Sequence, residues 1–133
     1  DVAAGIQASL PESGVDVLMG IGGSPEGVLT AAAIRCIGGA IQCTPWPRDD
    51  EEKRKAINEG VDLDHIYDAF EMVGGDDVFF AATGASTGEM LKGVRFFGGG
   101  ATTQSLVMRS RSGTVRWIDS IHNLDQLDKI RFD

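Results

Sequence analysis

The stretch VDVLMGIGGSPEG at residues 15–27 decides the fold. Its first part, 15–21, is a short and nearly continuous apolar run bounded by Gly14 and Gly22, which is typical of a strand buried on both faces. Ser24 then fits the N-cap of a helix, and Pro25 fits its first position. The stretch therefore predicts a central β-strand that leads through a glycine turn into a helix.

The segments on either side continue the alternation of helices and strands. Apolar spacing, capping residues and breakers predict an acid-capped helix over 2–10 stopped by Pro11, a helix over 26–37 ended by Gly38-Gly39, and a polar helix from Asp50 to Gly60. Two short helices are predicted from capping boxes at Asp68/Glu71 and Ser86/Glu89. Strands are predicted at 40–43, 65–67 and 78–82, and a hairpin is predicted from 102–109 with 114–122. This order predicts an α/β fold, a layered α/β sandwich with a mixed sheet.

Length and charge limit the function classes. The 133 residues allow one domain with one modest core. The net charge is −8 and the pI is about 4.6, which disfavours nucleic acid or an anionic membrane as a partner. No apolar run approaches the ~20 residues of a membrane span and no signal peptide is evident, so a cytoplasmic protein is expected. Cys36 and Cys43 lack metal or redox spacing and are expected to be reduced.

The loop at 20–27 is the best candidate for a functional site. A turn from a buried strand into a helix gathers free backbone amides and the positive end of the helix dipole, and glycines let the main chain approach a phosphate closely. Ligands of open α/β sheets also gather at the carboxyl ends of strands. The loop lacks the Lys-Ser/Thr pair of a Walker A motif and the GxGxxG spacing of a dinucleotide fold.

Glu26 has two interpretations from the residues alone. A glutamate in the first turn opposes the helix dipole, which contributes about 0.3–1 kcal/mol. A carboxylate beside a phosphate loop can also ligate a divalent cation. An acidic protein that binds a phosphorylated substrate must offset charge repulsion locally, and Mg²⁺ or Mn²⁺ held by carboxylates would do so.

Other polar residues give weaker signals. His65 and His122 have no Asp or Cys partner at ligand spacing, so both are expected to be surface or core histidines. Arg109, Arg111 and Arg116 surround the hairpin and are expected to be solvated charges at strand edges, although they fit a phosphate or a neighbouring subunit. Thr83-Gly84 follows a strand and fits either a simple turn or the lining of the same crevice.

GIGGSPEG at 20–27, continued by AAAIRCIGGAIQ at 31–42, resembles the class II fructose-1,6-bisphosphatases of bacteria. The resemblance extends, in the order of that family, over nearly the whole chain. The further matching segments are DVAAGI (1–6), FFAATG (79–84), LKGVRFFGGG (91–100) and SLVMRSRSGTVR (105–116).

The resemblance implies a metal-dependent sugar-phosphate phosphatase with the layered α/β fold of the lithium-sensitive phosphatases and inositol monophosphatases. The reaction implied is hydrolysis of the 1-phosphate of fructose 1,6-bisphosphate in gluconeogenesis, with Mn²⁺ or Mg²⁺ activating a water molecule. By the family pattern, Asp1 contacts the substrate, Gly23 contacts it through its backbone, and Glu26 ligates the metal. No residue of the chain is implied as the catalytic group itself.

The resemblance also implies that the chain is the C-terminal portion of such an enzyme. The other acidic metal ligands of the family, its water-positioning threonine and several sugar-phosphate contacts lie in an upstream, N-terminal half that is expected to be a partner. The 133 residues are then expected to have little activity alone, and a homo-oligomer is expected. Two alternatives stay open: sedoheptulose 1,7-bisphosphatase activity, and a non-catalytic phosphate-binding or regulatory α/β module.

Overall fold

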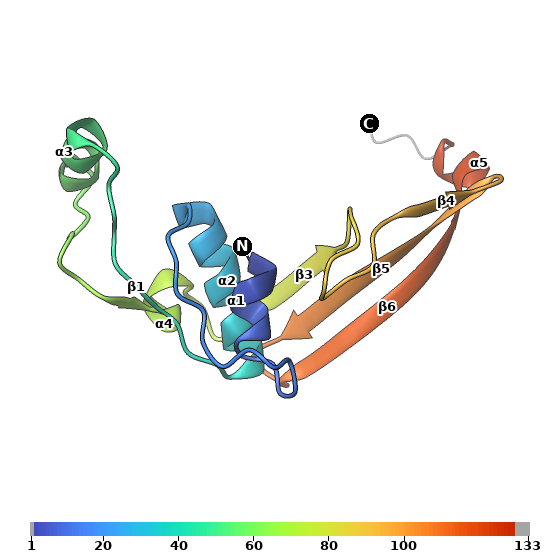
Figure 1. Ribbon diagram of the computed structural model, residues 1–133, viewed down its shortest axis with the longest axis horizontal. Coiled ribbons are helices and arrows are strands. Elements are labelled where there is room, and N and C mark those ends of the chain that lie inside the picture. Colours follow the sequence, from blue (N-terminus) through green and yellow to red (C-terminus); the bar gives the residue numbers. More distant parts are fainter. Residues whose placement is uncertain (1, 130–133) are drawn as a thin grey trace.

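The computed structural model describes residues 2–129 and shows helices and antiparallel strands in two groups (Figure 1). One group holds the main sheet with the helices packed against it, and the other is an arm that carries a polar helix. The elements run α1 (Val2–Gln7), α2 (Ser24–Ile37), β1 (Gln42–Cys43), α3 (Asp50–Asn58), β2 (Tyr67–Asp68), α4 (Ala69–Met72), β3 (Phe79–Thr83), β4 (Arg95–Phe97), β5 (Gly100–Arg109), β6 (Thr114–Asn123) and α5 (Leu124–Leu127).

The main sheet is built on β5, the long strand of the predicted hairpin. β6 pairs along the whole of β5, with Leu106 opposite Trp117. β3 and β4 pair with its two ends, for example through Phe80 opposite Met108. The α/β class is confirmed. Every pairing among the described residues is antiparallel. The run at 15–21, which was expected as a central strand, lies outside the sheet.

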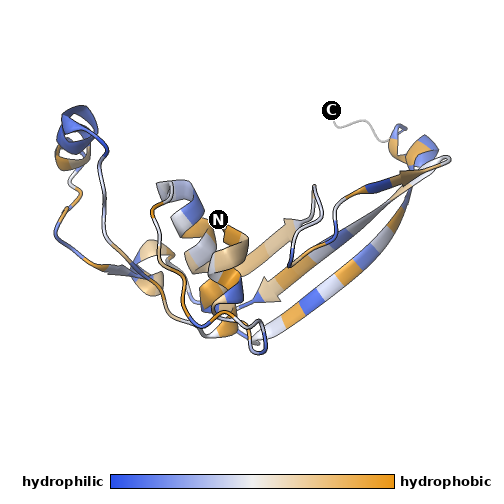
Figure 2. Cartoon of the chain, in the orientation of Figure 1, coloured by the Kyte–Doolittle hydropathy of each residue, from blue (hydrophilic) through white to orange (hydrophobic). Residues whose placement is uncertain are grey.

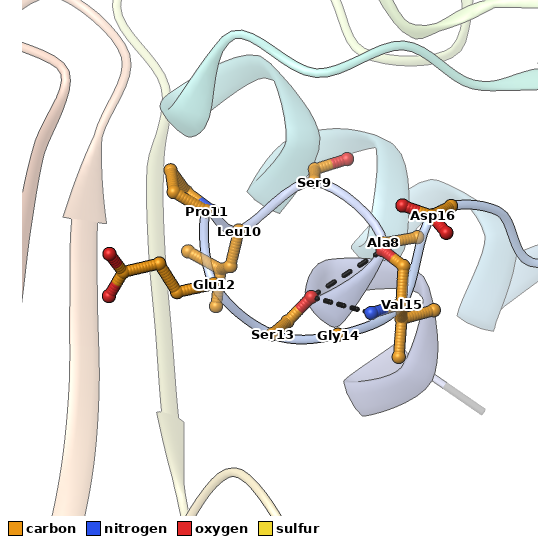
Figure 3. A pocket seen from close by; sticks show the side chains of 9 residues that line it. All are labelled: Ala8, Ser9, Leu10, Pro11, Glu12, Ser13, Gly14, Val15 and Asp16. Carbon is orange, nitrogen blue, oxygen red and sulfur yellow. Dashed lines mark hydrogen bonds between the residues drawn. The ribbon is translucent and has the colours of Figure 1, made fainter.

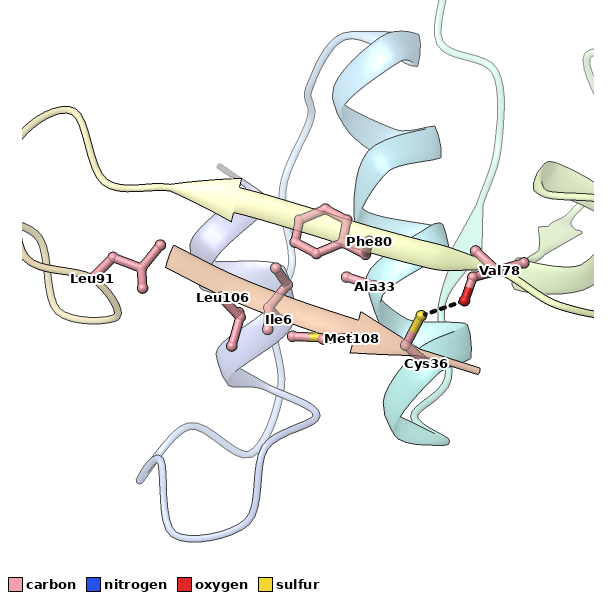
Figure 4. Packing of buried hydrophobic residues seen from close by; sticks show 8 residues of the cluster. All are labelled: Ile6, Ala33, Cys36, Val78, Phe80, Leu91, Leu106 and Met108. Atoms are coloured by element: carbon pink, nitrogen blue, oxygen red, sulfur yellow. Dashed lines mark hydrogen bonds between the residues drawn. The ribbon is translucent and has the colours of Figure 1, made fainter. Parts of the chain in front are cut away.

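The core lies where α1 and α2 meet β3 and β5 (Figure 4). Ile6 of α1, Cys36 of α2, and Leu106 and Met108 of β5 are its largest fully buried side chains. The Cys36 thiol donates to the carbonyl of Val78 at 3.4 Å, and burial raises the pKa of that thiol. The two cysteines are free thiols, as the sequence predicted.

Small residues let α2 approach its neighbours closely. Ala31 and Ala33 are fully buried, as expected from the alanine run. Ala31 packs with Ile34 and Ala69 in a second, smaller cluster beside α4. The helix ends at Gly38, whose φ of 75° is the left-handed conformation that favours glycine at this position.

The arm between α2 and β3 has little core of its own. The two-residue strands β1 and β2 pair with each other, and α3 has no buried residue. Figure 2 shows α3 as largely hydrophilic, in agreement with the polar helix expected there. The capping box of Asp68 and Glu71 is confirmed: the Asp68 carboxylate accepts from the amide of Glu71, and the Glu71 carboxylate accepts from the amide of Asp68.

Two predicted elements are wrong. Residues 15–21 form no strand and are largely exposed, because the described residues offer them no neighbouring strand. Residues 86–93 form a loop instead of a capped helix. Its turn is closed by the amide of Gly88, which donates to the carbonyl of Leu91, and by the amide of Gly93, which donates to Oγ1 of Thr87.

The strand at 78–82 also differs in detail from the prediction. It begins and ends one residue later, and only one of its faces is covered: Phe80 is buried whereas Phe79 is 64% exposed. Among the described residues, none of the helices combines the length and apolar character that crossing a membrane requires.

Candidate functional site

The candidate site lies where the loop 20–23 enters α2. The carbonyl of Gly23 accepts from the amide of Gly27 at 3.0 Å, which makes Gly23 the N-cap residue. The N-cap expected at Ser24 is therefore wrong: Ser24 is already the first helical residue, and no side chain caps the helix. Pro25 stands at the second position, where its missing amide leaves no donor unsatisfied. Within the described residues, no acceptor meets the amides of Ser24 and Glu26, so both remain available to an anion.

The carboxylate of Glu26 turns back toward the Gly23 backbone. A Cβ placed on Gly23 would lie 2.2 Å from Oε2 of Glu26 and 3.3 Å from its Cδ. Glu26 is exposed and lies in the first turn of a 14-residue helix. The two site residues predicted in this loop are thus neighbours in space, and both face solvent.

Thr30 supports this first turn, although it was not among the residues singled out from the sequence. Its hydroxyl donates to the carbonyl of Glu26 at 2.8 Å, and Thr30 is only 8% exposed. Its Cγ2 lies 2.4 Å from where a Cβ on Gly5 would be, so α1 packs directly against it. This contact could have been predicted from the sequence, because the hydroxyl of a helical threonine commonly donates to the carbonyl four residues earlier.

The described residues do not by themselves fit a divalent cation. No group of three or more His, Cys, Asp or Glu side chains among them is placed to hold a metal ion. Mg²⁺ and related ions are bound through several oxygens. One exposed carboxylate, that of Glu26, is not such a set. Asp1, the third predicted site residue, lies outside the described residues.

Each of the two histidines has a side-chain hydrogen-bond partner. Nε2 of His65 lies 2.7 Å from Oε1 of Glu71, and Nε2 of His122 lies 2.8 Å from Oγ1 of Thr103. The pKa of Glu71 is lowered, first by the amide of Asp68 and then by His65. Both pairs lie outside the loop at α2, and each is explained by local packing.

Arg109, which was expected to be a solvated charge at a strand edge, is partly exposed and has a defined partner. Its Nε donates to the two carboxylate oxygens of Asp77 at 3.0 and 3.1 Å, and its guanidinium carbon lies 4.9 Å from the centre of the Phe79 ring. This pair lowers the pKa of Asp77 and raises that of Arg109. Arg109 therefore anchors the segment before β3 to the end of β5.

Thr83 and Gly84 have structural partners. Oγ1 of Thr83 lies 2.8 Å from Oγ of Ser105 on the neighbouring strand. Gly84 is buried, and a Cβ there would lie 2.2 Å from the carbonyl oxygen of Lys92. Thr83-Gly84 was expected to form either a simple turn or part of the lining of the crevice. These contacts account for the simple turn.

Two hollows in the described part of the chain lie away from Gly23 and Glu26. One, of about 350 Å³, is lined by the turn at 8–16 (Figure 3). Oγ of Ser13 accepts from the amide of Val15 across it. The other, of about 380 Å³, lies between Lys53 and Ile57 of α3 and the residues 61–64. Neither contains a predicted site residue.

Comparisons with known proteins place this loop in context. Residues 1–122 match the family model of the bacterial fructose-1,6-bisphosphatase, glpX-encoded. A relative from Synechococcus, named D-fructose 1,6-bisphosphatase class 2/sedoheptulose 1,7-bisphosphatase, is 41% identical over an alignment of 138 positions, which covers 94% of this chain and 40% of the relative. The fructose-1,6-bisphosphatase class 2 of Haemophilus influenzae is 41% identical over an alignment of 143 positions, which covers 98% of this chain and 43% of the relative. The chain thus spans less than half the length of these relatives.

Proposed function

Because the chain belongs to the family of glpX-encoded bacterial fructose-1,6-bisphosphatases, we propose that it supplies part of the site of a sugar-bisphosphate phosphatase. The reaction proposed is hydrolysis of the 1-phosphate of fructose 1,6-bisphosphate to fructose 6-phosphate, as in gluconeogenesis. The observation that supports it best is the position of the Glu26 carboxylate against the Gly23 backbone at the start of α2.

The two predicted site residues of the loop have proposed roles. The backbone at Gly23 and the free amides of the first turn of α2 bind an oxygen of the substrate, because a helix N-terminus favours negative charge. Glu26 provides one oxygen ligand to a divalent cation, Mn²⁺ or Mg²⁺. The contact of Asp1 with the substrate stays a prediction.

The remaining ligands are proposed to come from polypeptide beyond the matched region. Glu26 by itself is one carboxylate, and the relatives are more than twice as long as the region that this chain matches. We therefore expect the 133 residues to be inactive alone and to form the site together with that further polypeptide. A homo-oligomer and a cytoplasmic location also stay predictions.

The test is reconstitution of phosphatase activity. The chain is co-expressed with the part of the Haemophilus influenzae relative that it does not match, and phosphate release from fructose 1,6-bisphosphate is measured with Mn²⁺ or Mg²⁺ and with a chelator. We expect release that depends on the cation and is lost in Glu26→Gln. Glu51→Gln is the matched control, because Glu51 is likewise an exposed glutamate in the first turn of a helix. Equal release from Glu26→Gln and the unaltered chain would contradict the proposal.

Two alternatives have specific support. The name of the Synechococcus relative includes sedoheptulose 1,7-bisphosphatase, so that sugar is assayed in parallel. A non-catalytic phosphate-binding module is favoured by the lack of a ligand group for a metal among residues 2–129. Binding of inorganic phosphate without release of phosphate from either sugar, in a complex that forms, would support the module.

A further inference from the structure

Thr30 is the one buried polar side chain among residues 2–129, and its two branches contact two different elements. Its hydroxyl donates to the carbonyl of Glu26, in the first turn of α2, at 2.8 Å. Its methyl carbon Cγ2 faces α1, where a Cβ built on Gly5 would lie only 2.4 Å away. Carbon atoms in contact are about 3.5–4.0 Å apart, so α1 reaches this position only because residue 5 has no side chain. One side chain thus joins the first turn of α2 to α1.

A second close contact shows that α1 and α2 run in the same direction. A Cβ on Gly39, just beyond the end of α2, would lie 2.2 Å from Oγ and 2.5 Å from Cβ of Ser9, just beyond the end of α1. Gly5 therefore lies beside Thr30 and Ser9 beside Gly39, so residue numbers rise together along both helices. Figure 1 shows the two helices side by side in this arrangement. The contact of Gly5 with Thr30 is the one nearer to the starts of the helices.

Each of the two residues in this contact follows a predicted site residue by four positions. Thr30 follows Glu26, and Gly5 follows Asp1, with α1 beginning at Val2. Four positions are about one turn of an α-helix, which has about 3.6 residues per turn. The distance between Gly5 and Thr30 therefore sets how closely the first turn of α1 approaches the first turn of α2.

We infer that Thr30 is a positioning residue of the candidate site. Its hydroxyl holds the carbonyl of Glu26, and its methyl group sets the distance from the first turn of α2 to α1. Because Thr30 is buried, it acts through the loop of Gly23 and Glu26 and not on a ligand directly. The inference rests on the proposed function, since it takes the roles of Gly23 and Glu26 from there. It adds that the site depends on a contact between α1 and α2.

A side chain at residue 5 would move the two first turns apart. Relief of a 2.4 Å approach to the ordinary distance between carbon atoms requires a separation that is larger by about 1 Å. Misplacement by about 1 Å can lower the rate of an enzyme by about a hundredfold. Helix propensity itself favours alanine over glycine, so a loss in Gly5→Ala would come from the contact with Thr30 and not from α1 alone.

The test exchanges the sizes of the two residues. Thr30→Ser removes Cγ2 and keeps the hydroxyl, after which a Cβ on Gly5 would lie 3.6 Å from both Cβ and Oγ of residue 30, an ordinary contact. The kcat/KM for phosphate release from fructose 1,6-bisphosphate is measured in the co-expressed complex. We expect Gly5→Ala to lower it at least about tenfold and the double variant to restore it to the level of Thr30→Ser. Equal losses in Gly5→Ala and in the double variant would overturn the inference.

Gly39→Ala is the matched control, because it places a methyl group between the same two helices at their far ends. Its Cβ would meet Ser9, and Gly39 is not among the glycines with positive φ, so alanine is not strained there by its backbone. Denaturant unfolding should show a lower midpoint for Gly39→Ala, as for Gly5→Ala. We expect kcat/KM of Gly39→Ala to stay within about twofold of the unaltered complex, since its contact is remote from the first turns. Equal loss of kcat/KM in Gly39→Ala and Gly5→Ala would assign Thr30 a structural role only and overturn the inference.

NMR of the 133-residue chain alone separates this inference from the proposed function. Gly5→Ala should shift the amide signals of residues 24 and 26–30, the double variant should return them, and Gly39→Ala should leave them in place. A complex of the unaltered chain that releases no phosphate would overturn the proposed function. The amide signals would then still decide whether Thr30 positions the loop, and signals that Gly5→Ala leaves unmoved would overturn that role. Phosphate release that Gly5→Ala leaves unchanged would overturn the positioning role alone.

Discussion

The Gly23 backbone and the Glu26 carboxylate lie in direct contact, since a Cβ on Gly23 would lie 2.2 Å from Oε2 of Glu26. The φ of Gly23 is −69°, which any residue adopts without strain. A side chain at this position would therefore meet the carboxylate of Glu26, although the backbone conformation itself admits any residue. A Cβ on Gly22, one residue earlier, would meet nothing within 4 Å.

Gly23→Ala is predicted to separate function from stability. The new methyl group would displace the flexible end of the Glu26 side chain and cover the backbone that is proposed to bind substrate. The fold should lose at most about 1 kcal/mol, because alanine is a poorer N-cap residue than glycine. We expect thermal unfolding close to that of the unaltered chain and a loss of phosphate release in the co-expressed complex. Retained release in Gly23→Ala, at the level of Gly22→Ala, would refute the proposed role of this contact.

Gly84→Ala is predicted to destabilise the fold. A Cβ at Gly84 would lie 2.2 Å from the carbonyl oxygen and 2.9 Å from the carbonyl carbon of Lys92, and backbone cannot move aside as a side-chain end can. Overpacking of this kind costs about 1–3 kcal/mol. Gly88→Ala, in the same loop with nothing within 4 Å, is the control and should leave stability nearly unchanged. Denaturant unfolding measures both variants, and equal midpoints would be evidence against the described loop.

Leu106→Ala is predicted to lower the free energy of unfolding by about 2–5 kcal/mol, because it leaves a cavity in the core. Leu106 is fully buried between the sheet and the two helices. Leu127→Ala makes the same change at a side chain that is 42% exposed, and it should cost far less. The comparison is made by denaturant unfolding. A similar loss in both variants would contradict the core that Figure 4 shows.

The ion pair of Arg48 with Glu52 at the start of α3 is predicted to make the stability of the fold depend on pH. The Arg48 guanidinium and amide lower the pKa of Glu52 from its ordinary 4.5 to about 2. The carboxylate is therefore favoured in the folded chain, so its contribution to stability is present above pH 4.5 and is lost as the pH falls toward 2. NMR titration of the Glu52 carboxyl group should give a midpoint near 2 that rises in Arg48→Gln. A midpoint near 4.5 in the unaltered chain would show that the pair does not form in solution.

Much of the fold is predictable because its signals are local. The helix over 2–10 is confirmed as α1, although it ends earlier, at Gln7. The glycine stop of α2 and the capping box of Asp68 with Glu71 are also confirmed. Each signal depends on residues within about one turn of the chain, whose chemistry is the same wherever the segment lies. The hairpin of β5 and β6 is confirmed for the same reason, since a short polar loop joins two strand-like runs.

The errors occur where the outcome depends on distant partners. The run at 15–21 has the composition of a buried strand, but a strand forms only where another strand accepts its hydrogen bonds. Arg109 pairs with Asp77, which lies 32 residues earlier in the sequence, so no local pattern predicts this contact. The hydrogen bond from Thr30 to the carbonyl of Glu26 is different, because it joins residues only four positions apart and could have been predicted from the sequence. At the candidate site, Gly23 and Glu26 could be named from the family resemblance, whereas their mutual contact required the structure.

The most direct test of the central claim is the position of Glu26 relative to metal in the co-expressed complex. Crystals of that complex soaked with Mn²⁺ are measured at the manganese absorption edge, and anomalous density marks the ion. We predict an ion at coordination distance from a carboxylate oxygen of Glu26, with its other ligands on the partner polypeptide. A manganese ion bound in the complex while the Glu26 side chain points into bulk solvent would contradict this claim.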